Sequence, residues 1–188
     1  PAAAAIAHDA QIATSGITTV FDALPFGTSY RNIERAESLA PLLEGLETAR
    51  KAGALRVDHF LHARCEVTDP DTITLLEPYL GDPRLRFVSL MDHAPGQRQS
   101  PDIAIYRTRH MATMNLSEAE MDEHITTILR RSAELAPGIR ARLVALAHEY
   151  GLPLSSHDDQ TAAHVEQAAA EGMVLSEFPT TMAAVKAA

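Results

Sequence analysis

Five glycines divide the sequence at the points where a helical pattern gives way to a short apolar run. They are Gly16, Gly53, Gly81, Gly151 and Gly172. Glycine readily adopts the left-handed conformation that ends many helices, so each is typical of a loop between a helix and a strand. The apolar runs that follow comprise residues 17–23, 55–67, 85–92, 152–156 and 173–178. Their length and composition predict buried strands of a parallel sheet.

Apolar stripes at helical spacing occupy the stretches between these runs. The first comprises Leu39, Leu42, Leu43 and Leu46, the second Met121, Ile125, Ile128 and Leu129, and the third Ile139, Leu143, Leu146 and Tyr150. Pro41 is expected to start or kink the first helix. Ser117 and Glu120 have the spacing of a capping box ahead of the second. We interpret the stripes as helix faces that pack on the sheet.

The alternation of strands and helices predicts a single α/β domain spanning residues 1–188. Five strands suit an open doubly wound sheet, whereas a closed (β/α)8 TIM-type barrel needs eight strands and roughly 200 residues or more. Strand number alone leaves both architectures open. Residues 94–115 are polar and longer than an ordinary connection, so we expect them to form an irregular functional loop.

The charge balance excludes some classes of partner. Sixteen Lys and Arg residues against 25 Asp and Glu residues give a net charge of −9, which argues against nucleic acid or an anionic membrane as a partner. The single cysteine, Cys65, rules out an intramolecular disulfide, and no leader or long apolar run is evident. We therefore expect a cytoplasmic protein. No Walker-type loop, GxGxxG motif or nucleophile elbow supports nucleotide, hydride-transfer or serine-hydrolase chemistry.

Acidic and imidazole side chains follow every predicted strand. They are Asp22, Glu66, Asp92 with His93, His157 with Asp158 and Asp159, and Glu177. In parallel α/β folds the working residues gather at the carboxyl ends of strands. An Asp after a strand can also simply cap the next helix, which is the reading we favour for Asp159.

Glu66, His93 and His157 form a carboxylate and imidazole set that suits a divalent metal, most readily Zn²⁺, with Mn²⁺ or Fe²⁺ as alternatives. Their separations of 27 and 64 residues (93 − 66 and 157 − 93) match no local metal-binding motif. The site therefore depends on the fold bringing the strand ends together. The competing interpretation is that each His is an ordinary hydrogen-bonded polar residue.

Several cationic side chains are candidates for holding an anion. Arg64 shares a strand face with His62 and Glu66, which predicts either a barrel interior or an exposed edge. Arg98 can clamp a phosphate, and Arg107 and Arg109 follow in the same loop, although a solvated loop is the alternative. We expect a surface position for His164, and no specific partners for His8, His110, His124 and His148.

Longer stretches of sequence resemble a known family. They are residues 15–20 (SGITTV), 64–66 (RCE), 89–99 (SLMDHAPGQRQ), 156–159 (SHDD) and 177–181 (EFPTT). In this order they resemble the diphosphatases of phosphonate catabolism in the amidohydrolase superfamily, which act on α-D-ribose 1-methylphosphonate 5-triphosphate in the carbon–phosphorus lyase pathway. The similarity extends over almost the whole chain.

The resemblance implies a partial (β/α)8 amidohydrolase barrel of about five to six parallel strands with outer helices. It implies a metal-dependent hydrolase that releases pyrophosphate from a ribose triphosphate substrate. Glu66, His93 and His157 match the family's metal ligands, and Arg98, Gln97, Arg64, Asp158 and Thr180 are the expected substrate-binding residues.

The sequence also departs from the family pattern. A His-x-Asp pair on the first strand and a catalytic Asp on the last strand of the relatives have no counterparts in these 188 residues. We therefore expect this chain alone to be inactive or nearly so. The alternatives are another amidohydrolase, such as a deacetylase or a deaminase, and a non-catalytic fragment whose open sheet edges drive self-association into a homo-oligomer.

Overall fold

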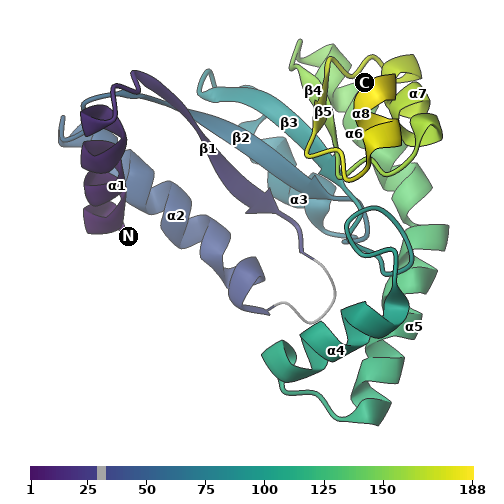
Figure 1. Cartoon of the computed structure of the whole chain (residues 1–188). Helices are drawn as coiled ribbons and strands as arrows, with labels where there is room; N and C mark the ends of the chain where they lie inside the picture. The colour runs from purple at the N-terminus through teal and green to yellow at the C-terminus, as the bar shows by residue number, and fades with distance from the viewer. Residues whose placement is uncertain (29–32) are drawn as a thin grey trace.

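A single parallel sheet organises the chain. The computed structural model describes residues 1–28 and 33–188. The five strands are β1 (Thr19–Phe26), β2 (Asp58–Glu66), β3 (Leu85–Met91), β4 (Leu154–His157) and β5 (Leu175–Glu177). All neighbours pair in parallel, in the order β1-β2-β3-β4-β5 (Figure 1). The α/β class and the five parallel strands are as the sequence predicts.

The strand order decides between the two predicted architectures. Each strand lies beside its predecessor, so every crossover moves along the sheet in the same direction. A doubly wound sheet instead reverses direction at a switch point, which is where its ligands bind. The described part of the chain has no such reversal. It is wound in one direction, as expected for a partial (β/α)8 barrel.

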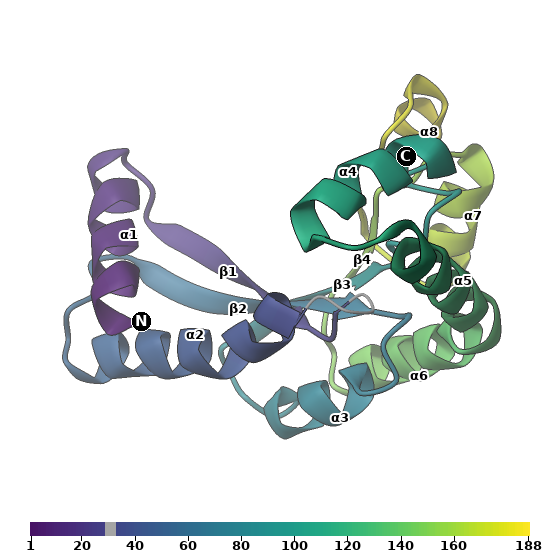
Figure 2. The ribbon, with the colours of Figure 1, turned by 90° about the horizontal axis from the view of Figure 1, so that it is seen from below.

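The helices of the described residues are α1 (Ala2–Thr14), α2 (Ile33–Lys51), α3 (Thr72–Leu76), the 3-10 helix η1 (Glu77–Tyr79), α4 (Ile103–Met114), α5 (Glu118–Glu134), α6 (Ala136–Glu149), α7 (Ala162–Ala170) and α8 (Met182–Ala187). Helix α1 precedes the first strand, α8 follows the last, and the other helices lie in the connections between strands. Figure 2 shows α2, α3, α6 and α7 following the outer side of the curved sheet. Helices α4 and α5 form a hairpin beyond the carboxyl ends of the strands (Figure 1).

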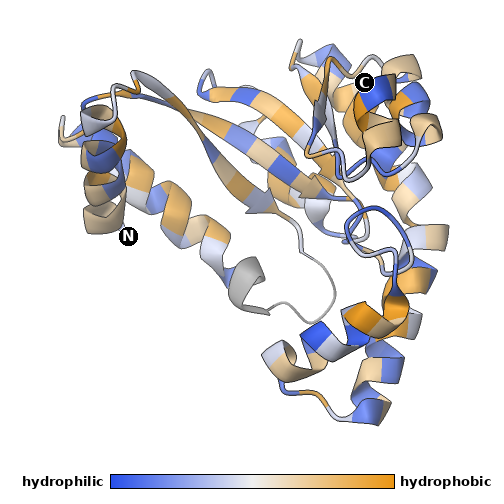
Figure 3. Ribbon diagram, in the orientation of Figure 1, coloured by the Kyte–Doolittle hydropathy of each residue, from blue (hydrophilic) through white to orange (hydrophobic). Residues whose placement is uncertain are grey.

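The two faces of β2 differ in polarity. Leu61, Ala63 and Cys65 lie in the apolar core, which also contains Leu39 of α2 and Leu143 of α6. Successive strand residues point to opposite faces, so His62, Arg64 and Glu66 lie on the inner face. Figure 3 shows polar and apolar colours alternating along the central strands, and polar colour along the loop after β3. The fold thus places apolar residues against the helices and polar residues on the inner face.

Three expectations about individual elements are wrong. Strand β1 continues to Phe26, so Asp22 lies within the strand, where its Oδ2 is 2.8 Å from His59 Nδ1, and not at a strand exit. Residues 94–115 are not wholly irregular, because Asp102 accepts hydrogen bonds from two amides and starts helix α4. Pro41 lies inside α2 and does not start it.

Asp9 attaches helix α1 to the start of β2. Its side chain is fully buried and accepts hydrogen bonds from the backbone N–H groups of Arg56 (2.7 Å) and Val57 (3.1 Å). The Arg56 guanidinium lies 2.9 Å from its second oxygen. Burial opposes ionisation, but these donors hold the pKa of Asp9 at about 2, below its usual 3.8. Asp9 is therefore a charged contact between α1 and the sheet.

None of the helices in the described residues is both long and apolar enough to cross a membrane.

We predict that Asp9→Ala lowers the melting temperature by several degrees at pH 7, because two buried amides and a guanidinium lose their acceptor. The folded-state pKa is depressed, so this stabilisation is complete above about pH 4 and is lost as pH falls toward 2. Thermal unfolding of the wild type and the variant between pH 2 and pH 7 measures both effects. Asp58→Ala, at an exposed position of β2, is the control. Equal melting temperatures for wild type and Asp9→Ala at pH 7 would contradict this role.

Candidate metal centre

The carboxyl ends of β2, β3 and β4 bring together the three predicted ligands. Glu66 is the last residue of β2 and pairs with Met91, the last residue of β3. His93 follows at the exit of β3, and His157 ends β4. The parallel register therefore places one carboxylate and two imidazoles at the same rim of the sheet.

His93, His157 and Asp158 form a group of side chains that could hold a metal ion. One ligand atom from each lies within 4.8 Å of the others. The two imidazole rings are 6.0 Å apart between centroids, and His157 and Asp158 are buried. Two neutral nitrogen donors and one carboxylate are a set that Zn²⁺ accepts while leaving positions open. Asp158, expected to bind substrate, thus lies among the candidate metal ligands.

A buried carboxylate oxygen without a hydrogen bond supports a cation at this position. Asp158 Oδ2 has no hydrogen-bond partner among the described residues, and His157 Nε2 lies 3.4 Å away. Leaving a carboxylate oxygen buried without a partner costs free energy, which a bound metal ion would recover. The donors and the unsatisfied oxygen fit a divalent ion.

Glu66 contacts the Nδ1 atom of His93. Its Oε2 is 2.5 Å from His93 Nδ1, and Thr68 donates a 2.7 Å hydrogen bond to its Oε1. Burial opposes ionisation, but these two partners hold the pKa of Glu66 below its ordinary value. A carboxylate bonded to one nitrogen of a ligating imidazole orients the ring and raises its basicity. Direct ligation by Glu66 stays a prediction.

Glu177 has the same relation to His157. Its Oε2 is 2.8 Å from His157 Nδ1, which leaves Nε2 facing Asp158. Burial opposes ionisation of Glu177, but His157 holds its pKa below the ordinary value. Sequence reasoning placed Glu177 at a strand exit without giving it a role in the site. The signal it lacked was the pairing of His157 with Glu177 across β4 and β5.

The polar residues of β2 lie on a central strand of the sheet. Strand β2 lies between β1 and β3, so the predicted alternative of an exposed edge is wrong. His62 Nε2 is 2.8 Å from Ser89 Oγ, and burial lowers the pKa of His62 to about 4. Arg64 is only partly buried and reaches 3.3 Å from His157 Nε2 and 3.9 Å from Glu177 Oε1. Arg64 is thus a cation within reach of the candidate metal centre.

The turn after β4 has an unusual backbone. Asp158 adopts a positive φ of 54°, and the amide of Asp158 donates a 2.9 Å hydrogen bond to the Glu177 carbonyl. This left-handed conformation costs a non-glycine residue roughly 1–2 kcal/mol. Such conformations persist only where surrounding contacts impose them, and they concentrate at functional sites.

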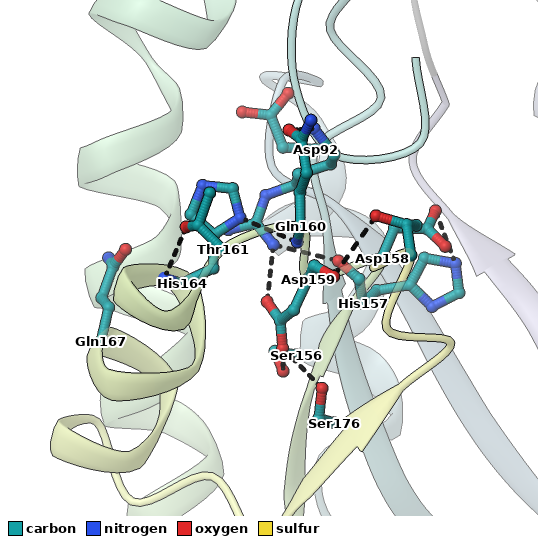
Figure 4. A network of polar contacts seen from close by, with 12 residues as sticks. Asp92, Ser156, His157, Asp158, Asp159, Gln160, Thr161, His164, Gln167 and Ser176 are labelled. Atoms are coloured by element: carbon teal, nitrogen blue, oxygen red, sulfur yellow. Dashed lines mark hydrogen bonds and ion pairs between the residues drawn. The ribbon is translucent and has the colours of Figure 1, made fainter. Parts of the chain in front are cut away.

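The other predicted substrate-binding residues contact the protein itself. Arg98 is buried, and its Nη1 lies 3.0 Å from Asp159 Oδ1. Gln97 donates to Asp92 at 3.0 Å, and the Thr180 amide donates to the Asp159 carbonyl at 2.8 Å. Asp159 therefore does not cap α7 as expected. Thr161 caps that helix, and Asp159 points from the end of β4 toward Ser156 and Ser176 (Figure 4).

Arg107 and three further histidines have partners within the protein. Arg107 forms ion pairs with Glu118 and Asp122. The Nε2 atom of His124 is 2.9 Å from Tyr106 Oη, and that of His148 is 3.0 Å from the Glu171 carbonyl. The expectation that these histidines lack partners is wrong. His164 is half-buried, and its Nδ1 accepts a 3.3 Å hydrogen bond from the Gln160 amide.

Comparison with known proteins identifies one detailed similarity. No protein-family model matches the chain, and no solved structure matches it. The chain is 37% identical over 180 residues to alpha-D-ribose 1-methylphosphonate 5-triphosphate diphosphatase of Escherichia coli (strain K12). The alignment covers 96% of this chain and 48% of that enzyme, so the chain spans about half the length of the curated relative it matches. The family resemblance of its motifs is thereby confirmed, and the chain is homologous to that part of the diphosphatase.

Proposed function

We propose that the chain forms part of a metal-dependent diphosphatase that releases pyrophosphate from α-D-ribose 1-methylphosphonate 5-triphosphate in phosphonate catabolism. The observation that carries the proposal is the convergence of His93, His157 and Asp158 at the carboxyl ends of the strands. The homology to a diphosphatase supports the substrate class. The single, buried Cys65 is compatible with the reducing cytoplasm that we propose as its location.

The proposed cofactor is Zn²⁺, with Mn²⁺ or Fe²⁺ as alternatives that accept the same donors. His93, His157 and Asp158 would hold it, with Glu66 either as a further ligand or as the orienting partner of His93. When bound, such an ion polarises phosphoryl oxygens and lowers the pKa of a bound water toward neutrality.

The chain's own residues would position the reacting groups. Glu66 and Glu177 fix the two imidazoles through their Nδ1 atoms. Arg64 is the partly exposed cation of the centre, and its guanidinium suits a phosphate oxygen. We therefore propose Arg64 as the phosphate-binding arginine among the residues that the sequence suggested. Phosphoryl transfer depends mainly on such positioning and on charge stabilisation.

The proposal concerns a longer enzyme than these 188 residues. The relative is about twice as long as the aligned part of the chain. In the described structure both outer strands, β1 and β5, have one unpaired edge. We expect the 188-residue chain alone to be inactive or nearly so, and a longer chain to be the active form.

We predict that His157→Ala abolishes tight Zn²⁺ binding, because it removes one ligand and the partner of Glu177. The loss should be at least as large as the roughly 10- to 100-fold that removal of an outer-shell partner costs. Competition with a chelating dye measures the affinity. His8→Ala, at an exposed position of α1, is the matched control. Unchanged Zn²⁺ affinity in His157→Ala would refute the metal centre.

Pyrophosphate release separates the proposed activity from other amidohydrolase reactions. We expect a chain of the relative's length to release pyrophosphate from the ribose triphosphate, to lose this activity with chelator, and to regain it with Zn²⁺ or Mn²⁺. Arg64→Met should raise KM for the triphosphate more than it changes Zn²⁺ affinity, because the guanidinium binds phosphate and not metal. Turnover of N-acetyl or amidine substrates in place of the triphosphate would favour a deacetylase or deaminase.

A further inference from the structure

The turn that follows β4 presents side chains to two sides of the sheet. His157 and Asp158 face the candidate metal centre, whereas Asp159 points toward Ser156 and Ser176 (Figure 4). Asp158 in between has the positive φ of 54°. Some contact must hold this conformation, since free chains avoid it.

Arg98 supplies contacts along the whole turn. Its Nη1 donates to the His157 carbonyl and to Asp159 Oδ1, both at 3.0 Å. Its backbone amide donates a 3.1 Å hydrogen bond to Gln160 Oε1. One residue of the loop after β3 therefore bonds to the residue before Asp158 and to the two residues after it.

Arg98 forms an ion pair with the buried side chain of Asp159. Asp159 is fully buried, and its Oδ2 accepts hydrogen bonds from the hydroxyls of Ser156 and Ser176. Arg98 is the only cationic side chain that an ion pair joins to Asp159 in the described part of the chain. Without the guanidinium, the carboxylate would remain buried and uncompensated, which strongly destabilises the arrangement around it. The turn would have to rearrange to relieve it.

The position of Arg98 argues against a primary role as a phosphate clamp. Its side chain is only 7% exposed. It lines a cavity of about 250 Å³ together with Ser132, Arg140 and His164, on the helix side of the sheet. His93, His157 and Asp158 do not line this cavity. A phosphate there would have to compete with Asp159 for Nη1 and would lie apart from the candidate metal ligands.

We propose that Arg98 is a positioning residue which, through Asp159 and the His157 carbonyl, holds the turn that presents His157 and Asp158 to the metal. This inference rests on the proposed metal centre. Arg98 acts on the ion through the turn and touches neither the metal nor the substrate.

The test measures Zn²⁺ affinity by dye competition and the visible spectrum of the Co²⁺-loaded protein, neither of which requires turnover. We expect Arg98→Met to weaken Zn²⁺ binding about 10- to 100-fold, as loss of an outer-shell partner does. The Co²⁺ spectrum should change because the Asp158 carboxylate leaves its position. Arg98→Lys should recover part of the affinity, since an ammonium can still pair with Asp159.

Arg140→Met is the matched control. Arg140 lines the same cavity and is also paired with a carboxylate, that of Glu171 at 2.7 Å, but none of its hydrogen bonds reaches the β4 turn. We expect this variant to keep the wild-type Zn²⁺ affinity and Co²⁺ spectrum. An equal loss in both variants would mean a general effect of destabilisation and would overturn the positioning role.

The double variant Arg98→Met with Asp159→Asn covers the case in which Arg98→Met does not fold. It removes both charges and so leaves no buried carboxylate unpaired. We expect it to fold and still to bind Zn²⁺ weakly. Wild-type affinity in either Arg98→Met protein, with weakened triphosphate binding, would overturn the proposal in favour of a phosphate clamp. If the wild type bound Zn²⁺ weakly and His157→Ala left that affinity unchanged, the result would instead refute the proposed metal centre.

Discussion

The alignment of the carboxyl ends of β2, β3, β4 and β5 is the constraint on which the site depends. His157 pairs with Glu177 and Glu66 with Met91 in a sheet wound in one direction. Residues separated by as many as 111 positions (177 − 66) therefore meet at one rim. The backbone hydrogen bonds of the sheet set the spacing between these strands. The apolar core holds the outer face of the sheet against the helices, so the polar residues of the inner face keep fixed positions relative to one another.

Two carboxylates and two imidazoles form two hydrogen-bonded pairs at this rim. Glu66 and Glu177 each bind the Nδ1 atom of one histidine, and the Nε2 atom of His157 lies 3.4 Å from Asp158 Oδ2. The helix side of the same strand ends carries a second polar layer, in which Arg98 and Asp159 form a buried ion pair. The strained Asp158 lies at the junction of the two layers, which is why contacts on one side can affect metal ligands on the other.

Sequence patterns were sufficient to predict the strands and the position of Glu66, His93 and His157 at one rim of the sheet, because apolar runs and strand-end positions depend on local residues. They failed where a side chain had two chemically plausible partners. Asp159 was expected to cap α7, whereas Thr161 caps this helix. The ion pair of Asp159 with Arg98 joins residues 61 positions apart, so the local sequence gives no signal of it. Asp22 was misplaced because β1 continues through Pro25, a residue that usually interrupts strands. The proposed substrate class came from the resemblance to a family, because no residue spacing in this chain indicates a substrate.

Zinc K-edge X-ray absorption of the metal-loaded protein tests the central claim most directly, because it counts the imidazoles bound to the ion. The proposed centre predicts a first shell with two imidazole nitrogens and at least one carboxylate oxygen at about 2.0–2.2 Å from the zinc. Replacing His93 or His157 should reduce the imidazole count by one. A first shell without imidazole, or one unaffected by either replacement, would contradict a metal centre at the ends of these strands.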